Sequence, residues 1–145
     1  MEITKHHRRP RFRGGDERPW NISFVYVKQH EAWHTIFNHL EPEEICKIIN
    51  EYYLNCYCRF ICRRKKDGAL NQNHDHGCRH PSPTQKQRDA WITLFNGMDS
   101  ETIRKIINAV WLDYRYEFIP GQRRGGLTFR TFSQISQEHN CVPVG

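Results

Sequence analysis

The residues best equipped for chemistry are the cysteines and histidines gathered between positions 56 and 80. Thiolate sulfur and imidazole nitrogen are the ligands that zinc prefers, and a structural zinc site takes four of them. The segment contains seven such donors, more than one Zn²⁺ ion needs. Our preferred ligand set is Cys58, Cys62, His76 and Cys78, with His74, His80 and Cys56 as substitutes.

Two interpretations of this cluster stay open. Cys58 and Cys62 lie four positions apart, so on a helix they would share one face. The polar linker 67–84 is long enough to fold its donors back onto them, which predicts a zinc site although the spacing matches no standard zinc finger. Alternatively, the cysteines are small core residues and the histidines belong to a polar loop, because free cysteine is among the most buried residue types.

A metal-dependent hydrolase is a third interpretation, suggested by the short string His74-Asp75-His76. Metal nuclease sites contain such residues, but they also need a strand–helix frame that this segment lacks. Short motifs without structural context are mostly chance matches. No nucleophile–base pair, phosphate loop or carboxylate dyad is recognisable, so the sequence predicts a protein that is not an enzyme.

Basic residues form a second candidate site, since the chain carries a net charge of +6. They gather in the first 18 residues, after the cysteines and around position 123, and Arg-Gly-Gly occurs twice. Such segments bind nucleic acid through backbone charge, although solubilising tails and helix ends are also basic. The expected phosphate contacts are Arg8, Arg9, Arg11, Arg13, Arg63, Arg64, Lys65, Lys66, Arg123 and Arg124.

The candidate metal ligands and basic residues must be positioned by a fold, and the main signal for that fold is a duplicated segment. Residues 28–60 return as residues 86–118 without a gap, every counterpart lying 58 positions later, as Trp91 follows Trp33. Repeated sequence usually means one supersecondary unit used twice. In each copy the apolar residues recur at helical spacing over two stretches, around Trp33 and around Ile48 in the first copy.

Each copy is therefore predicted to be a helical hairpin with one apolar face. A single hairpin cannot cover that face, whereas two packed together can. We expect a mainly α fold in which two tandem-duplicated hairpins form a four-helix core with approximate two-fold symmetry.

The segments before and after the repeat carry weaker structural signals. Residues 1–18 predict a flexible basic arm, residues 19–120 the duplicated helical domain, and residues 121–145 a flexible tail. Trp20–Val27 alternates apolar and polar residues, which favours a strand. Its expected partner is Leu127–Ile135, giving a small β-ribbon from the two flanks, or a strand of another chain. A homodimer therefore remains open.

The beginning of the chain is polar and basic, and no stretch approaches the ~20 apolar residues of a membrane span. We expect no membrane partner and an intracellular location, nuclear or cytoplasmic. The combined features are typical of a small zinc-stabilised regulatory or virus-type accessory protein that binds nucleic acid, DNA or RNA, through phosphate contacts. The alternative is a non-enzymatic protein–protein adaptor that uses the helical core.

Overall fold

The computed structural model describes residues 2–55, 57–71 and 80–121. Each copy of the repeat folds into two helices followed by a strand. The first copy contains α1 (Val27–Phe37), α2 (Pro42–Ile48) and β3 (Arg59–Arg64), and the short β4 (Leu70–Asn71) follows in the linker between the copies. The second copy contains α3 (Gln85–Phe95), α4 (Ser100–Ile106) and β5 (Tyr116–Gly121). Before them come β1 (Ile3–His7), the 3-10 turns Arg11–Arg13 and Pro19–Asn21, and β2 (Ile22–Tyr26).

The helices begin where side chains can satisfy their first N–H groups. Pro42 opens α2, where its missing N–H costs nothing. Thr84 and Gln87 form a capping box at the start of α3, and the Asp99 carboxylate accepts from the Thr102 N–H to cap α4. The predicted hairpins α1–α2 and α3–α4 are therefore present.

The prediction of a mainly α fold is wrong, because the described residues combine four helices with two antiparallel sheets. Both copies were expected to stay helical to their ends, yet they end in β3 and β5. After α2 and α4 the helix widens into one π-helical turn, closed by hydrogen bonds from Leu54 N to Ile49 O (3.0 Å) and from Leu112 N to Ile107 O (2.9 Å). Beyond that turn Phe60 and Cys62 are buried while the residue between them is only partly covered, a period of two that suits a strand.

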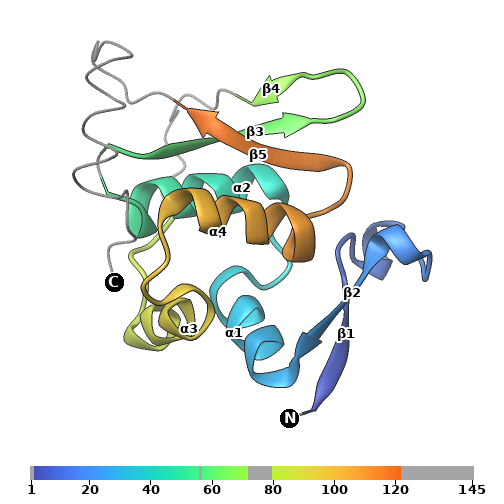
Figure 1. The fold of residues 1–145 in the computed structure, drawn as a ribbon, viewed down its shortest axis with the longest axis horizontal. Coiled ribbons are helices and arrows are strands. Elements are labelled where there is room, and N and C mark those ends of the chain that lie inside the picture. Colours follow the sequence, from blue (N-terminus) through green and yellow to red (C-terminus); the bar gives the residue numbers. More distant parts are fainter. Residues whose placement is uncertain (1, 56, 72–79, 122–145) are drawn as a thin grey trace.

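The elements form layers. Figure 1 shows the sheet β4–β3–β5 on one side of α2 and α4, and the packed pair α1–α3 on the other side. The strands β3 and β5 pair antiparallel, with Ile61 directly opposite Ile119. The core lies between the layers and is rich in aromatic rings, among them Trp33, Trp91 and Phe118.

Two equivalent asparagines fasten the strands to the helices. The Asn50 side chain accepts from Phe60 N and donates to Phe60 O, both at 2.8 Å. Asn108 does the same with Phe118, at 2.7 Å and 2.9 Å. An asparagine amide matches a backbone peptide in donor and acceptor, so each one continues the strand's hydrogen bonding toward the helix.

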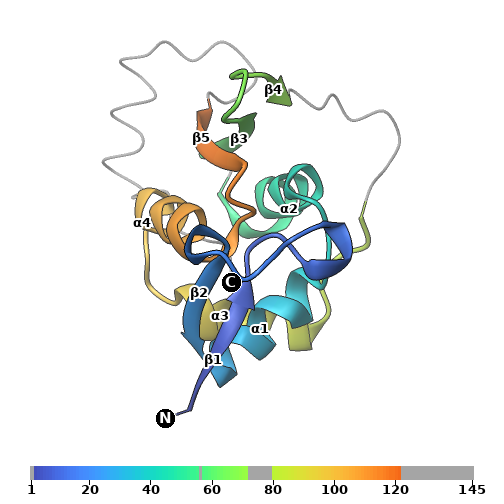
Figure 2. The same ribbon diagram turned by 90° about the vertical axis from the view of Figure 1, so that its right-hand side faces the viewer.

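The N-terminal residues form a separate ribbon. The strand predicted within Trp20–Val27 is confirmed as β2, but its partner is β1. The partner expected from the C-terminal flank, residues 127–135, lies outside the described residues. Figure 2 shows the ribbon beside α1, with which both strands make contact. Residues 3–7 thus form a paired strand within the segment expected to be a flexible arm.

Among the residues that the structure describes, no helix is long and apolar enough to cross a membrane.

Candidate metal centre

Three histidines converge where the ribbon meets α1. His30 and His34 are four positions apart on α1 and therefore share one face, and β1 brings His6 against them. Their ligand nitrogens all lie within 4.8 Å of one another, so the group could hold a metal ion. His6 is buried, with 3% of its surface exposed, and the other two are partly buried.

A backbone carbonyl determines the tautomer of His6. Its Nε2 lies 2.9 Å from the carbonyl oxygen of Trp111. Because a carbonyl only accepts, Nε2 must carry the hydrogen and donate it. In the neutral ring this leaves a lone pair on Nδ1, and Nδ1 is the atom that faces His30 Nε2 at 3.4 Å.

The same arrangement applies to His34. Its Nδ1 donates to the carbonyl oxygen of Asn38, 3.0 Å away, at the residue that ends α1 with a φ of 48°. The Nε2 of the neutral His34 ring is therefore unprotonated, and it faces His30 Nε2 at 2.9 Å. Metal-ligating histidines characteristically donate their outer N–H to a backbone carbonyl or carboxylate in this way.

The spacing between the inner nitrogens suits a small cation. Ligand nitrogens about 2.0–2.1 Å from a tetrahedral zinc ion are about 3.3–3.4 Å from each other. The distances of 3.4 Å and 2.9 Å around His30 Nε2 are close to that value. Without an ion, a proton on His30 Nε2 can instead be donated to His34, so a hydrogen-bonded imidazole cluster is the competing explanation.

All three rings are favoured in the neutral form, which is the form that binds metals. Burial lowers the pKa of His6 from 6.5 to about 4, with smaller contributions from the nearby His30 and His34. Burial also lowers the pKa of His30 and of His34, and in each case a neighbouring histidine adds to the effect.

A small cavity adjoins the cluster. Its volume is about 30 Å³, and its wall includes His6, His34, His39 and Asp113. That volume is enough for a water molecule, which needs polar partners of this kind. A tetrahedral ion held by three imidazoles would find its fourth ligand here.

The ligands predicted from the sequence are not brought together within the described residues. Cys62 points into the core from β3 with 2% of its surface exposed, and Cys58 is disulfide-bonded, so it offers no thiolate. The helical-face argument for this pair fails because Cys62 lies on the strand β3 and Cys58 precedes that strand, outside any helix. The backbone carbonyl of His80 accepts from Tyr52 Oη at 2.6 Å. The other predicted ligands, Cys56, His74, His76 and Cys78, lie outside the described residues.

Cys46 lies near Cys62 in the core. Its Sγ donates to Phe60 O at 3.3 Å. Burial raises the pKa of Cys46 to about 12 and also raises the pKa of Cys62. Both side chains are free thiols, and burial disfavours the thiolate that zinc would require.

Most of the predicted phosphate-binding arginines have partners inside the molecule. Arg8 Nε donates to Leu112 O at 2.8 Å, and its guanidinium also reaches Asn108 O. The other pairs are Arg11 with Glu17, Arg13 with Glu41 and the carbonyl of His39, Arg63 with Glu117, and Arg64 with Asp67. Lys65 and Lys66 are exposed, and Arg123 and Arg124 lie outside the described residues.

The chain matches no family model, no curated protein and no solved structure. The His30–His34 spacing is visible in the sequence, but its third member, His6, belongs to a segment whose composition suggested a flexible arm.

Proposed function

We propose that this protein is a non-enzymatic accessory protein that binds one first-row transition-metal ion, best matched by Zn²⁺. The ligands are His6 Nδ1, His30 Nε2 and His34 Nε2. One observation carries the proposal: backbone carbonyls take the outer N–H of His6 and of His34, which leaves their inner nitrogens unprotonated and directed at His30.

The donor set selects the class of metal. Three imidazoles suit zinc, copper, nickel or iron, whereas magnesium and calcium prefer oxygen ligands. Zinc accepts three histidines and one further ligand in a tetrahedral arrangement, and the adjoining cavity supplies room for one water.

The proposed role of the ion is structural. Three histidines and a water also occur in catalytic zinc sites, but those sites need space for a substrate. A cavity of about 30 Å³ holds a water and little else. The ion would have ligands from both β1 and α1, so it would stabilise the packing of the N-terminal strand against the duplicated core.

The test is metal analysis of untagged protein together with Co²⁺ substitution. The expected result is one ion per chain, intense visible absorption of tetrahedral Co²⁺, and a lower melting temperature after chelation. His6→Asn and His34→Asn should abolish the stoichiometric binding.

His39→Asn is the matched control. The His39 ring lies 5.2 Å from the His34 ring and lines the adjoining cavity, but it is outside the three-nitrogen cluster. Because the proposed fourth ligand is a water and not His39, this variant should still bind one ion. A second comparison is Cys78→Ser. Loss of metal in Cys78→Ser with retention in His6→Asn would contradict the proposal and place the ion among the cysteines.

A further inference from the structure

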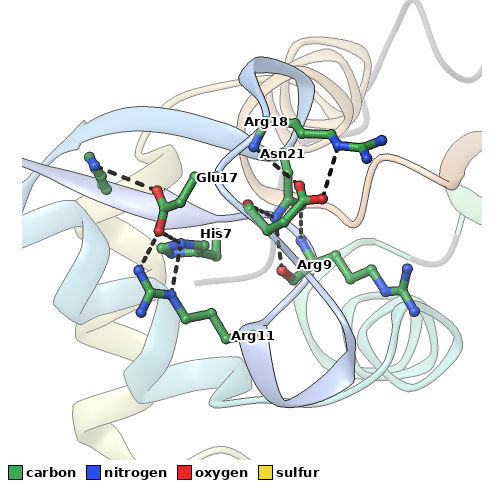
Figure 3. Close-up of polar contacts among 8 residues, drawn as sticks. His7, Arg9, Arg11, Glu17, Arg18 and Asn21 are labelled. Atoms are coloured by element: carbon green, nitrogen blue, oxygen red, sulfur yellow. Dashed lines mark hydrogen bonds and ion pairs between the residues drawn. The ribbon is translucent and has the colours of Figure 1, made fainter.

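The loop between β1 and β2 is built around a buried asparagine. The Asn21 side chain accepts from Arg9 N at 2.7 Å and donates to Arg9 O at 3.1 Å and Asp16 O at 2.8 Å. Figure 3 shows these contacts at the centre of the loop. Asn21 is fully buried, so residues 9–21 are held in one conformation.

Further contacts fix the same loop from outside. The Glu17 carboxylate is surrounded by Lys5, His7 and Arg11, as Figure 3 also shows for His7 and Arg11. Gly15 packs so closely on the backbone of Arg9 that a Cβ would lie 1.7 Å from Arg9 O. The loop is therefore a preformed surface, and binding to it needs little further ordering.

This preformed loop presents two aromatic rings to solvent. Phe12 is 66% exposed and Trp20 is 51% exposed. A guanidinium lies over each ring, that of Arg13 at 5.1 Å from the Phe12 centroid and that of Arg18 at 5.3 Å from the Trp20 centroid. Exposed rings beside arginines are the elements with which proteins stack unpaired bases and hold the connecting phosphates.

One cation of the loop has no partner within the described residues. Arg9 Nε is buried without a hydrogen-bond acceptor, and the guanidinium forms no ion pair there. Because the guanidinium has no ion-pair partner, its charge favours an arriving anion at this side chain.

From these features we infer that the β1–β2 loop is a binding surface for single-stranded nucleic acid. Bases stack on Phe12 and Trp20, and a phosphate is bound by Arg9. Duplex DNA is a poorer match, because its bases are already stacked and paired. An acidic protein could satisfy Arg9 but would not use the two exposed rings. The inference concerns a different surface from the metal centre and does not depend on it.

Trp20 supplies a direct readout. The other three tryptophans, Trp33, Trp91 and Trp111, are buried, so a base that stacks on the loop should quench Trp20 fluorescence selectively. We would titrate the full chain with a single-stranded oligonucleotide of about 12 nucleotides, as DNA and as RNA, at several salt concentrations. Quenching by either, with affinity that decreases as salt increases, is the expected result.

Three variants sharpen the test, with a labelled oligonucleotide as the probe. Phe12→Ala should weaken binding about tenfold or more, as expected for loss of one stacked base. Arg9→Ala should weaken it and reduce the slope of log affinity against log salt by about one. The control is Phe24→Ala, since Phe24 is 69% exposed but lies on β2 outside the loop, and this variant should bind as the wild type does.

Several results would overturn the inference. One is an unchanged affinity in Phe12→Ala whose melting temperature matches that of the wild type. Another is equal weakening by Phe24→Ala, which would place the contact elsewhere on the ribbon. A polyglutamate peptide that binds as tightly as the oligonucleotide would show a general anion surface for acidic proteins instead.

Discussion

The ring of Trp33 stacks on the ring of Trp111 with centroids 5.1 Å apart and an interplanar angle of 13°. Trp33 belongs to the first copy of the repeat and Trp111 to the second. Their counterparts repeat the contact in reverse, because Trp91 of the second copy stacks on Tyr53 of the first at 4.4 Å and 19°. Each copy therefore completes the aromatic core of the other.

Loss of either central ring should destabilise the whole core. Trp33→Ala and Trp91→Ala are each expected to lower the free energy of unfolding by about 3–5 kcal/mol, since both rings are buried. Denaturant titration followed by circular dichroism measures this. Ile92→Ala, at an exposed position of the same helix as Trp91, should stay within about 0.5 kcal/mol. A loss below about 1 kcal/mol in both tryptophan variants would contradict the packing described.

The side chains of Asn50 and Asn108, which connect each strand to its helix, should contribute similar amounts to the stability of the fold. Asn108→Ala leaves Phe118 N without its side-chain acceptor, while Phe118 O keeps the donor Arg104 Nη1. Asn50→Ala does the same to Phe60, whose carbonyl oxygen keeps the donor Cys46 Sγ. We expect each change to cost about 1–3 kcal/mol of unfolding free energy. Asn96→Ala, at an exposed helix end, is the control and should have little effect. A large cost at only one of the two positions would mean that the copies do not rely on this asparagine equally.

Arg8 should stabilise the fold, although the sequence suggested a phosphate contact. Its guanidinium donates to the carbonyls of Leu112 and Asn108 near the end of the second copy. Arg8→Ala should lower the free energy of unfolding by about 1.5–3 kcal/mol, the range for hydrogen bonds to charged groups. Arg11→Ala, which removes an exposed ion pair with Glu17, should cost less than about 1 kcal/mol. Equal melting temperatures for the two variants would contradict this distinction.

The metal-free protein should become less stable as the pH falls below 6.5. The pKa of His6 is about 4 in the folded state and 6.5 when unperturbed, so between these values the unfolded chain binds a proton that the folded protein does not. Stability is therefore highest above pH 6.5 and decreases toward pH 4. Between pH 7.5 and 5 the loss from this residue is about 2 kcal/mol.

Urea titrations at the two pH values, with chelator present, measure that loss. In His6→Asn the difference between the two pH values should shrink by a similar amount. If wild type and variant lose the same free energy between pH 7.5 and 5, His6 does not titrate as its burial implies.

The helical part of the fold was predictable because its signal is long and repeated. Around Trp33 and Ile48 the apolar spacing runs over several turns and returns 58 residues later. The strands β3 and β5 span six residues each, and so short an alternation is hard to distinguish from the end of a helix. The spacing of Cys58 and Cys62 does not distinguish the two structures either. Residues four positions apart share a face on a helix and also on a strand, so the pair was compatible with the helix that we expected in place of β3.

The metal centre could be predicted only in part. His30 and His34 lie at a spacing that any helical assignment places on one face, but His6 reaches them through the pairing of β1 with β2. The composition of residues 1–18 suggested a chain too polar to fold alone. It contained no signal that one histidine of this segment would be buried against Trp111.

The pairing of Ile61 with Ile119 has a consequence for the architecture of the chain. These two residues are counterparts in the repeat, and they face each other in the β3–β5 ladder, so the axis that relates the copies passes between them. Two separate half-length chains could form the same ladder and the same aromatic core around that axis. The protein thus has the architecture of a homodimer joined into one chain, and joining lets the two halves differ: Cys56, Cys58 and Cys62 of the first half correspond to Tyr114, Tyr116 and Pro120 of the second.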